Sequence, residues 1–105
     1  MRVIEKNMCR AISNKKPFSS SNTSVTFSAD NSQAFVYLHG NHIATVSDNN
    51  IQIFDGGWQS NTTKSRLNSL LETFTGLGRG LYQRNWQWFV QSNNNPFYSG
   101  MILNT

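Results

Sequence analysis

Four short apolar runs with a period of two, all within residues 23–54, constrain the fold of this chain more than any other feature. They read TSVTFSA, QAFVYLH, HIATVSD and IQIFD. Alternation of apolar and polar residues is typical of strands that bury one face. Turn-forming residues separate the runs, at 29–32, 39–42 and 47–50. Because links this short join antiparallel neighbours, we predict an antiparallel meander of about four strands.

The second link carries a specific hairpin signal. Gly40 and Asn41 lie between two apolar runs, and glycine supplies the positive φ that a two-residue turn requires. We predict a turn centred on these residues, with His39 and His42 facing each other across the ladder. Two facing imidazoles could share a metal ion. Two ligands do not make a site, however, so we interpret them as polar caps of a hairpin tip and expect no metal.

The segment after the meander has a helical period. In TTKSRLNSLLETF the apolar residues recur at i, i+3, i+4 and i+7, at Leu67, Leu70, Leu71 and Phe74. Ser60, Asn61 or Thr62 can cap this helix, and Gly76 can end it. A helix with one apolar stripe and a sheet with one apolar face bury both by packing together.

The two ends of the chain complete the predicted architecture. Residues 1–22 are interpreted as an N-terminal arm or short helix followed by a loop, and residues 23–105 as a single α+β domain. Within YQRNWQWFV, Trp86 and Trp88 are expected on the same side of a strand, and FYSGMIL as a last strand. The predicted fold class is therefore α+β, with the meander packed against one main helix and one or two closing aromatic strands.

Length and composition narrow the function classes. A chain of 105 residues suits one domain, and the single cysteine, Cys9, excludes an internal disulfide framework and a cysteine zinc site. No stretch approaches the roughly 20 apolar residues that span a bilayer. We therefore expect a cytoplasmic protein that does not bind membranes.

Catalytic residues are hard to place. The five acidic residues form no convincing carboxylate pair of the kind that hydrolysis or metal-dependent phosphoryl transfer requires. GLGRG follows a helix and lacks the Lys and hydroxyl of a nucleotide loop. We expect neither an enzyme nor a cofactor.

The start of the predicted helix is the first candidate binding site. Hydroxyls, free backbone N–H groups and two cations would gather at its positive end, where phosphates and carboxylates are commonly held. The residues are Ser60, Thr62, Thr63, Lys64 and Arg66. The alternative is that the hydroxyls only cap the helix and the cations lie in solvent.

A second candidate follows the helix. Arg79, Tyr82 and Arg84 precede the aromatic run, and basic residues interleaved with aromatics can bind single-stranded nucleic acid by stacking and backbone attraction. We assign Trp86 and Trp88 to the core or to a subunit contact, which leaves Tyr82 and Arg84 to act outward.

Three segments together resemble a small domain of phage and phage-related bacterial proteins. They are YLHGNHIATV, GGWQSNTTKSRLNSLL and YQRNWQWFV, and the likeness covers residues 22 to 91. The matching positions are His39, Gly40, Asn41, Gly57, Trp58, Thr62, Thr63, Lys64, Arg66, Leu67 and Asn68. The resemblance implies a viral or mobile-element source. It implies no activity, because the group has none established.

The net charge of the chain indicates which class of partner to expect. The net charge is +4 and the isoelectric point is near 9.7, which favours a nucleic-acid or acidic partner. We expect a non-enzymatic phage protein that binds nucleic acid through Lys64, Arg66, Arg79 and Arg84, as a monomer or a homodimer. The alternative is an effector that binds and modulates a host protein through exposed aromatics.

Overall fold

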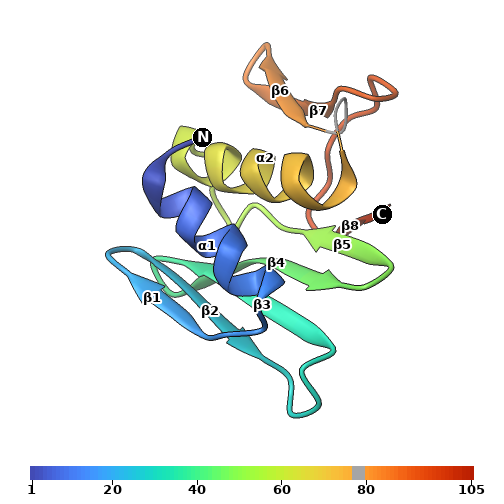
Figure 1. Ribbon diagram of the computed structural model, residues 1–105. Helices are drawn as coiled ribbons and strands as arrows, with labels where there is room; N and C mark the ends of the chain where they lie inside the picture. Colours follow the sequence, from blue (N-terminus) through green and yellow to red (C-terminus); the bar gives the residue numbers. More distant parts are fainter. Residues whose placement is uncertain (77–79) are drawn as a thin grey trace.

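Two helices cover one face of a six-stranded antiparallel sheet, and a small hairpin extends from the far side of the helices (Figure 1). The computed structural model describes residues 1–76 and 80–105. Its helices are α1 (Val3–Ser13) and α2 (Asn61–Thr75). The main sheet contains β1 (Phe18–Ser20), β2 (Thr23–Phe27), β3 (Gln33–Leu38), β4 (Asn41–Ser47), β5 (Asn50–Ile53) and β8 (Met101–Asn104). The hairpin consists of β6 (Leu81–Arg84) and β7 (Gln87–Val90). The α+β prediction is confirmed.

The meander predicted from the alternating runs is the centre of the sheet. Strand order is β1-β2-β3-β4-β5-β8, so each strand from β1 to β5 pairs with its neighbour in sequence. The last strand returns to the β5 edge, where Ile53 pairs with Met101. One predicted closing strand therefore completes the main sheet. The aromatic closing segment instead forms the separate β6–β7 sheet.

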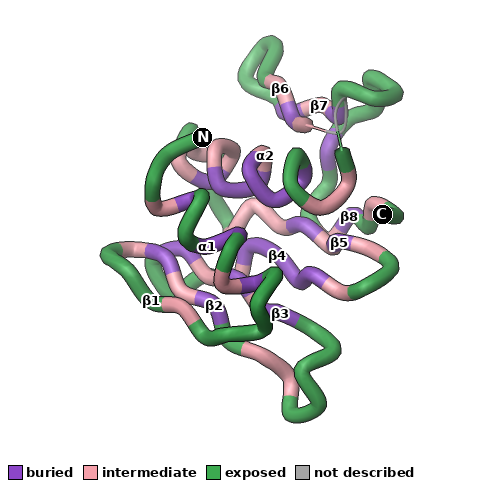
Figure 2. The backbone as a smooth tube through the Cα atoms, in the orientation of Figure 1, coloured by how far each residue is buried: buried purple, intermediate pink, exposed green. Residues whose placement is uncertain are grey.

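Alternation along the strands divides the sheet into an inner and an outer face. On β3, Ala34, Val36 and Leu38 are buried, while Phe35 and Tyr37 are half-buried on the outer face. The inner residues meet Leu67, Leu70 and Leu71 of α2, which are fully buried. Figure 2 shows the buried positions between the helices and the sheet. The predicted packing of the helical stripe on the apolar face is confirmed.

The N-terminal segment is part of this core. Met8, Cys9 and Ile12 of α1 are buried, and α1 packs against α2 and against β1 and β2. The segment predicted as an arm or short helix therefore supplies an 11-residue helix and, through β1, an edge strand. Its apolar residues were visible in the sequence, but their partner, α2, lies some 60 positions away.

Candidate functional site

The first turn of α2 is capped as predicted. Ser60 is the N-cap, and its Oγ accepts a hydrogen bond from the Thr63 N–H at 3.1 Å. The Ser60 and Thr63 hydroxyls also lie 2.9 Å apart, and Thr63 is buried. These two hydroxyls therefore form the cap of α2 and contact each other. Thr62 and Lys64 remain partly accessible.

Arg66 lies in the interior and not on the predicted binding surface. It is 3% exposed, and its Nη1 donates to Glu5 Oε2 at 2.8 Å. Its Nε donates to the Thr23 hydroxyl at 3.0 Å, and its Nη2 to Asn22 Oδ1 at 3.2 Å. The guanidinium thus joins α2 to α1 and to the start of β2. A phosphate would have to displace Glu5 to reach it.

The Glu5 carboxylate is held ionised by this network. Burial opposes its ionisation, but the Ser65 hydroxyl, the Arg2 N–H and the Arg66 guanidinium all donate to it and together lower the pKa of Glu5. The pair is therefore electrically neutral within the fold. It adds no positive charge to the surface.

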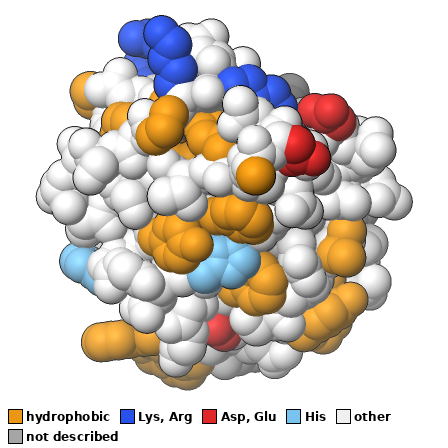
Figure 3. Space-filling view, turned by 90° about the horizontal axis from the view of Figure 1, so that it is seen from below, with side chains coloured by type: hydrophobic (Ala, Val, Ile, Leu, Met, Phe, Trp, Pro, Cys, Tyr) orange, Lys and Arg blue, Asp and Glu red, His pale blue; other side chains and the backbone are white. Residues whose placement is uncertain are grey.

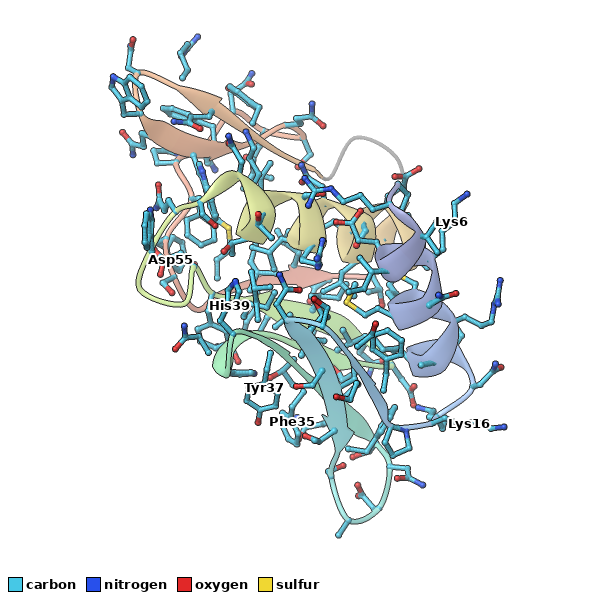
Figure 4. All side chains as sticks on the ribbon, turned by 90° about the vertical axis from the view of Figure 1, so that its left-hand side faces the viewer. Lys6, Lys16, Phe35, Tyr37, His39 and Asp55 are labelled. Carbon is cyan, nitrogen blue, oxygen red and sulfur yellow. The ribbon has the colours of Figure 1, made fainter. Side chains whose placement is uncertain are left out.

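A basic stripe on α1 was missed in the sequence. Arg2, Lys6 and Arg10 recur every four residues and are exposed, and Lys15 and Lys16 follow the helix. Glu5, the one acidic residue of α1, is buried beneath them. Figure 4 shows Lys6 and Lys16 on the α1 side of the molecule, pointing into solvent. The spacing of four in MRVIEKNMCR was the available signal.

Lys64 lies next to this stripe. It lines a shallow depression between α1 and α2, together with Met1 and with two acidic residues, the buried Glu5 and the exposed Glu72. We define the basic face as Arg2, Lys6, Arg10, Lys15, Lys16 and Lys64. Lys15 approaches Asp48 at 3.8 Å, but both side chains are largely exposed, so the pair is weak. Most of the cations of the chain therefore gather on one side.

The second predicted candidate forms the β6–β7 hairpin. Tyr82 stacks on Phe89, with ring centroids 5.5 Å apart, and the Arg84 guanidinium carbon lies 5.4 Å from the centre of the Phe89 ring. The Tyr82 hydroxyl donates to Asn94. Tyr82 and Arg84 are thus brought together, but on a different element from Lys64. Arg79 lies outside the described residues.

The two tryptophans of the hairpin do not share a side, contrary to the sequence prediction. Asn85 and Trp86 form the turn, with φ of 52° and 64°, and Trp86 is 90% exposed. Trp88 lies on β7, is 1% exposed and packs edge-on against Phe97. The prediction treated the segment as one strand, whereas the chain reverses at Trp86. A bulky residue with positive φ is rare in such a turn.

A pocket of about 270 Å³ lies where the β3–β4 turn meets the start of α2. It brings together His39 and Asn41 from the turn, Asp55 and Trp58 from the loop after β5, and Thr62 from α2. Figure 4 shows His39 and Asp55 on the same side of the molecule. Residues of YLHGNHIATV and GGWQSNTTKSRLNSLL, two of the segments singled out above, thus converge in one cavity with Asp55.

The loop that carries Trp58 packs closely against side chains of β4. Gly56 has φ of 69°, and a Cβ there would lie 3.4 Å from side-chain atoms of both Asn41 and Ile43. The Asp55 Oδ1 accepts the Gly57 N–H at 2.8 Å. Trp58 is 77% exposed, so its indole stands at the rim of the pocket with most of its surface open.

The β3–β4 turn lies one residue earlier than predicted. Leu38 pairs with Asn41, so the central residues are His39 and Gly40, with φ of 52° and 77°. His39 takes the left-handed conformation that the prediction assigned to Gly40 and Asn41. The two histidines therefore do not face each other. Among the described residues, no three His, Cys, Asp or Glu side chains are placed to hold a metal ion.

His42 belongs instead to an aromatic cluster on the outer face of the sheet. The centroid of its ring lies 4.7 Å from that of Phe54 and 5.6 Å from that of Tyr37. Its Nε2 is 2.9 Å from the Thr45 hydroxyl oxygen. Figure 3 shows one histidine among hydrophobic side chains in the middle of this face, with Lys and Arg gathered at one edge. The aromatic cluster is thus separated from most of the positive charge.

The fold and these surfaces define a small α+β protein with a basic helical face and a pocket at the start of α2. Within the part of the chain that the structure describes, no helix is long and apolar enough to cross a membrane.

The chain belongs to the Kyanoviridae Gp96 protein family, whose model matches residues 1–104. This is a phage protein family of unknown function. The predicted phage association is therefore confirmed. No curated protein and no solved structure matches the chain.

Proposed function

We propose that the protein is a non-enzymatic nucleic-acid-binding protein that holds the phosphate backbone on its basic face. The observation that carries this proposal is the exposed stripe formed by Arg2, the N-cap of α1, and by Lys6 and Arg10, with no exposed acidic residue on that helix. Clustered cations on one face are the electrostatic footprint of phosphate binding. The proposal places the protein in the cytoplasm of the infected host, as a monomer or a homodimer.

Lys64 extends the stripe onto α2. It shares a depression with Met1, the residue before Arg2, and it follows the capped first turn of α2. The positive end of the α2 dipole adds to the attraction for a phosphate near Lys64. Arg66 is left out, because its guanidinium is bonded to Glu5, Thr23 and Asn22.

Two charge-matched variants test the proposal. Lys6→Ala/Arg10→Ala removes two cations from the basic face, and Arg79→Ala/Arg84→Ala removes two from the segment that the sequence singled out. Both have the same net charge, and alanine favours the α1 helix. Binding of labelled single- and double-stranded DNA and RNA is measured by fluorescence polarisation. We expect the first variant to weaken binding several-fold more than the second. Equal affinity of wild type and both variants would refute the proposal.

The second candidate function is binding of a host protein through the β6–β7 hairpin. Trp86 favours it, because this side chain is 90% exposed at the hairpin tip, in a backbone conformation that a bulky residue rarely takes. Tryptophan and arginine are typical anchors of protein interfaces. A host protein captured from nuclease-treated lysate should then bind wild type and Trp58→Ala, but not Trp86→Ala.

A further inference from the structure

The pocket beside α2 has the composition of a site for a planar, uncharged ligand. Among the described residues that line it, Asp55 alone carries a formal charge, and it is negative. An anion is therefore disfavoured inside the pocket, although the helix start lies beside it. The remaining polar groups include the Asn41 amide, the His39 imidazole and the Thr62 hydroxyl.

These groups match the edge and the face of a nucleobase. Asn41 offers donors and an acceptor, Asp55 offers acceptors, and Thr62 offers either, which is what the hydrogen-bonding edge of a base requires. Trp58 supplies an exposed aromatic face at the rim, and bases stack on such faces. A volume of about 270 Å³ lies just below the usual range for drug-sized ligands and suits a single ring system.

Lys64 is the member of the basic face that lies at the same end of α2 as the pocket, whereas Figure 4 shows Lys6 and Lys16 on the opposite side of the view from His39 and Asp55. Thr62 and Thr63 line the pocket, whereas Lys64, the next residue of α2, lines the depression shared with the start of α1. A strand whose phosphate lies at Lys64 would therefore have a base close to Trp58. No cation lines the pocket among the described residues, so the phosphate and the base are held by different groups.

We propose that this pocket binds one nucleobase of a single-stranded nucleic acid, stacked on Trp58 and hydrogen-bonded by Asn41, Asp55 and Thr62. This inference rests on the proposed function, because the strand that brings the base is held by the basic face. It differs from that function in the part of the nucleic acid that is bound, a base in place of the phosphates, and in the residues that bind it.

The test distinguishes binding of the base by the pocket from binding of the phosphates by the basic face. The four ribonucleosides, which lack phosphate, are titrated while NMR follows the Trp58 indole N–H and the His39 ring. Trp58→Ala is compared with Trp86→Ala, since both side chains are largely exposed and either variant should fold. Binding of a mixed-sequence single strand and of an abasic strand of equal length is measured in parallel.

We expect at least one nucleoside to shift the Trp58 and His39 signals in wild type and Trp86→Ala. We also expect Trp58→Ala to bind the mixed-sequence strand about tenfold more weakly and the abasic strand equally well. If the abasic strand binds but nucleosides cause no shift and Trp58→Ala binds both strands as wild type does, the pocket inference falls and the proposed function stands. If nucleosides bind and the abasic strand does not, the pocket stands and the role of the basic face falls.

Discussion

At the scale of single residues, the buried Glu5–Arg66 pair gives Arg66 a structural role in place of the predicted role in binding. Both side chains are almost fully buried, and the pair joins α1 to α2. The sequence predicts that Arg66 lies at a helix start, but it does not distinguish an exposed cation from a buried one at that position. The acidic partner is 61 residues away. Only the packing of α1 on α2 reveals which of the two roles Arg66 has.

Replacing Arg66 alone should destabilise the protein severely. Arg66→Met leaves the Glu5 carboxylate buried without its partner, and the expected cost is about 3–5 kcal/mol in the free energy of unfolding. Glu5→Leu/Arg66→Met removes both charges and should recover much of that loss. Urea unfolding of wild type and both variants measures the difference. A cost below about 1 kcal/mol for Arg66→Met would mean that the pair does not hold the helices together.

The same pair predicts how stability depends on pH. The pKa of Glu5 is lowered in the folded protein, so the unfolded state binds the proton more tightly. The stabilisation is therefore present above the ordinary pKa of 4.5 and is lost as pH falls through the lower folded value. The free energy of unfolding of wild type should fall over this range. The double variant, which lacks the carboxyl, should lose this part of the dependence.

At the scale of elements, the sequence patterns predicted the type of each helix and strand better than the positions of the turns between them. The meander and α2 follow from periodicity and capping residues, and both are observed. The β3–β4 turn was placed one residue late because His39, and not only Gly40, takes positive φ. The β6–β7 turn was not predicted, because a bulky residue such as Trp86 rarely takes positive φ. The pocket at the start of α2 could not be foreseen, because residues 38–43 and 55–63 line it together only in the folded chain.

The conformation of His39 gives a prediction at this scale. Its φ of 52° is better suited to asparagine, and Asn-Gly is the preferred pair for such a turn. His39→Asn should raise the free energy of unfolding by up to about 1 kcal/mol. It should also weaken nucleoside binding, because the imidazole lines the pocket. Thermal unfolding and the nucleoside titration check the two effects. A destabilised variant would contradict the assignment of His39 to the turn.

At the scale of the whole molecule, charge and aromatic surface lie on different sides. The basic face lies on the helical layer and the aromatic cluster of Phe35, Tyr37 and His42 lies on the outer face of the sheet (Figure 3), whereas the hairpin extends from the far side of the helices (Figure 1). The net charge of +4 was readable from composition. The stripe on α1 follows from a local spacing of four, whereas the addition of Lys64 depends on α1 packing against α2, which no local pattern encodes.

The most direct test of the basic face is the salt dependence of binding to a single-stranded oligonucleotide. If about five phosphates are neutralised, the slope of log K against log salt concentration should be about −3 to −4. Lys6→Ala/Arg10→Ala should make that slope shallower by about 1 to 2, whereas Arg79→Ala/Arg84→Ala should leave it unchanged. A slope near zero, or one that Lys6→Ala/Arg10→Ala does not change, would contradict the account.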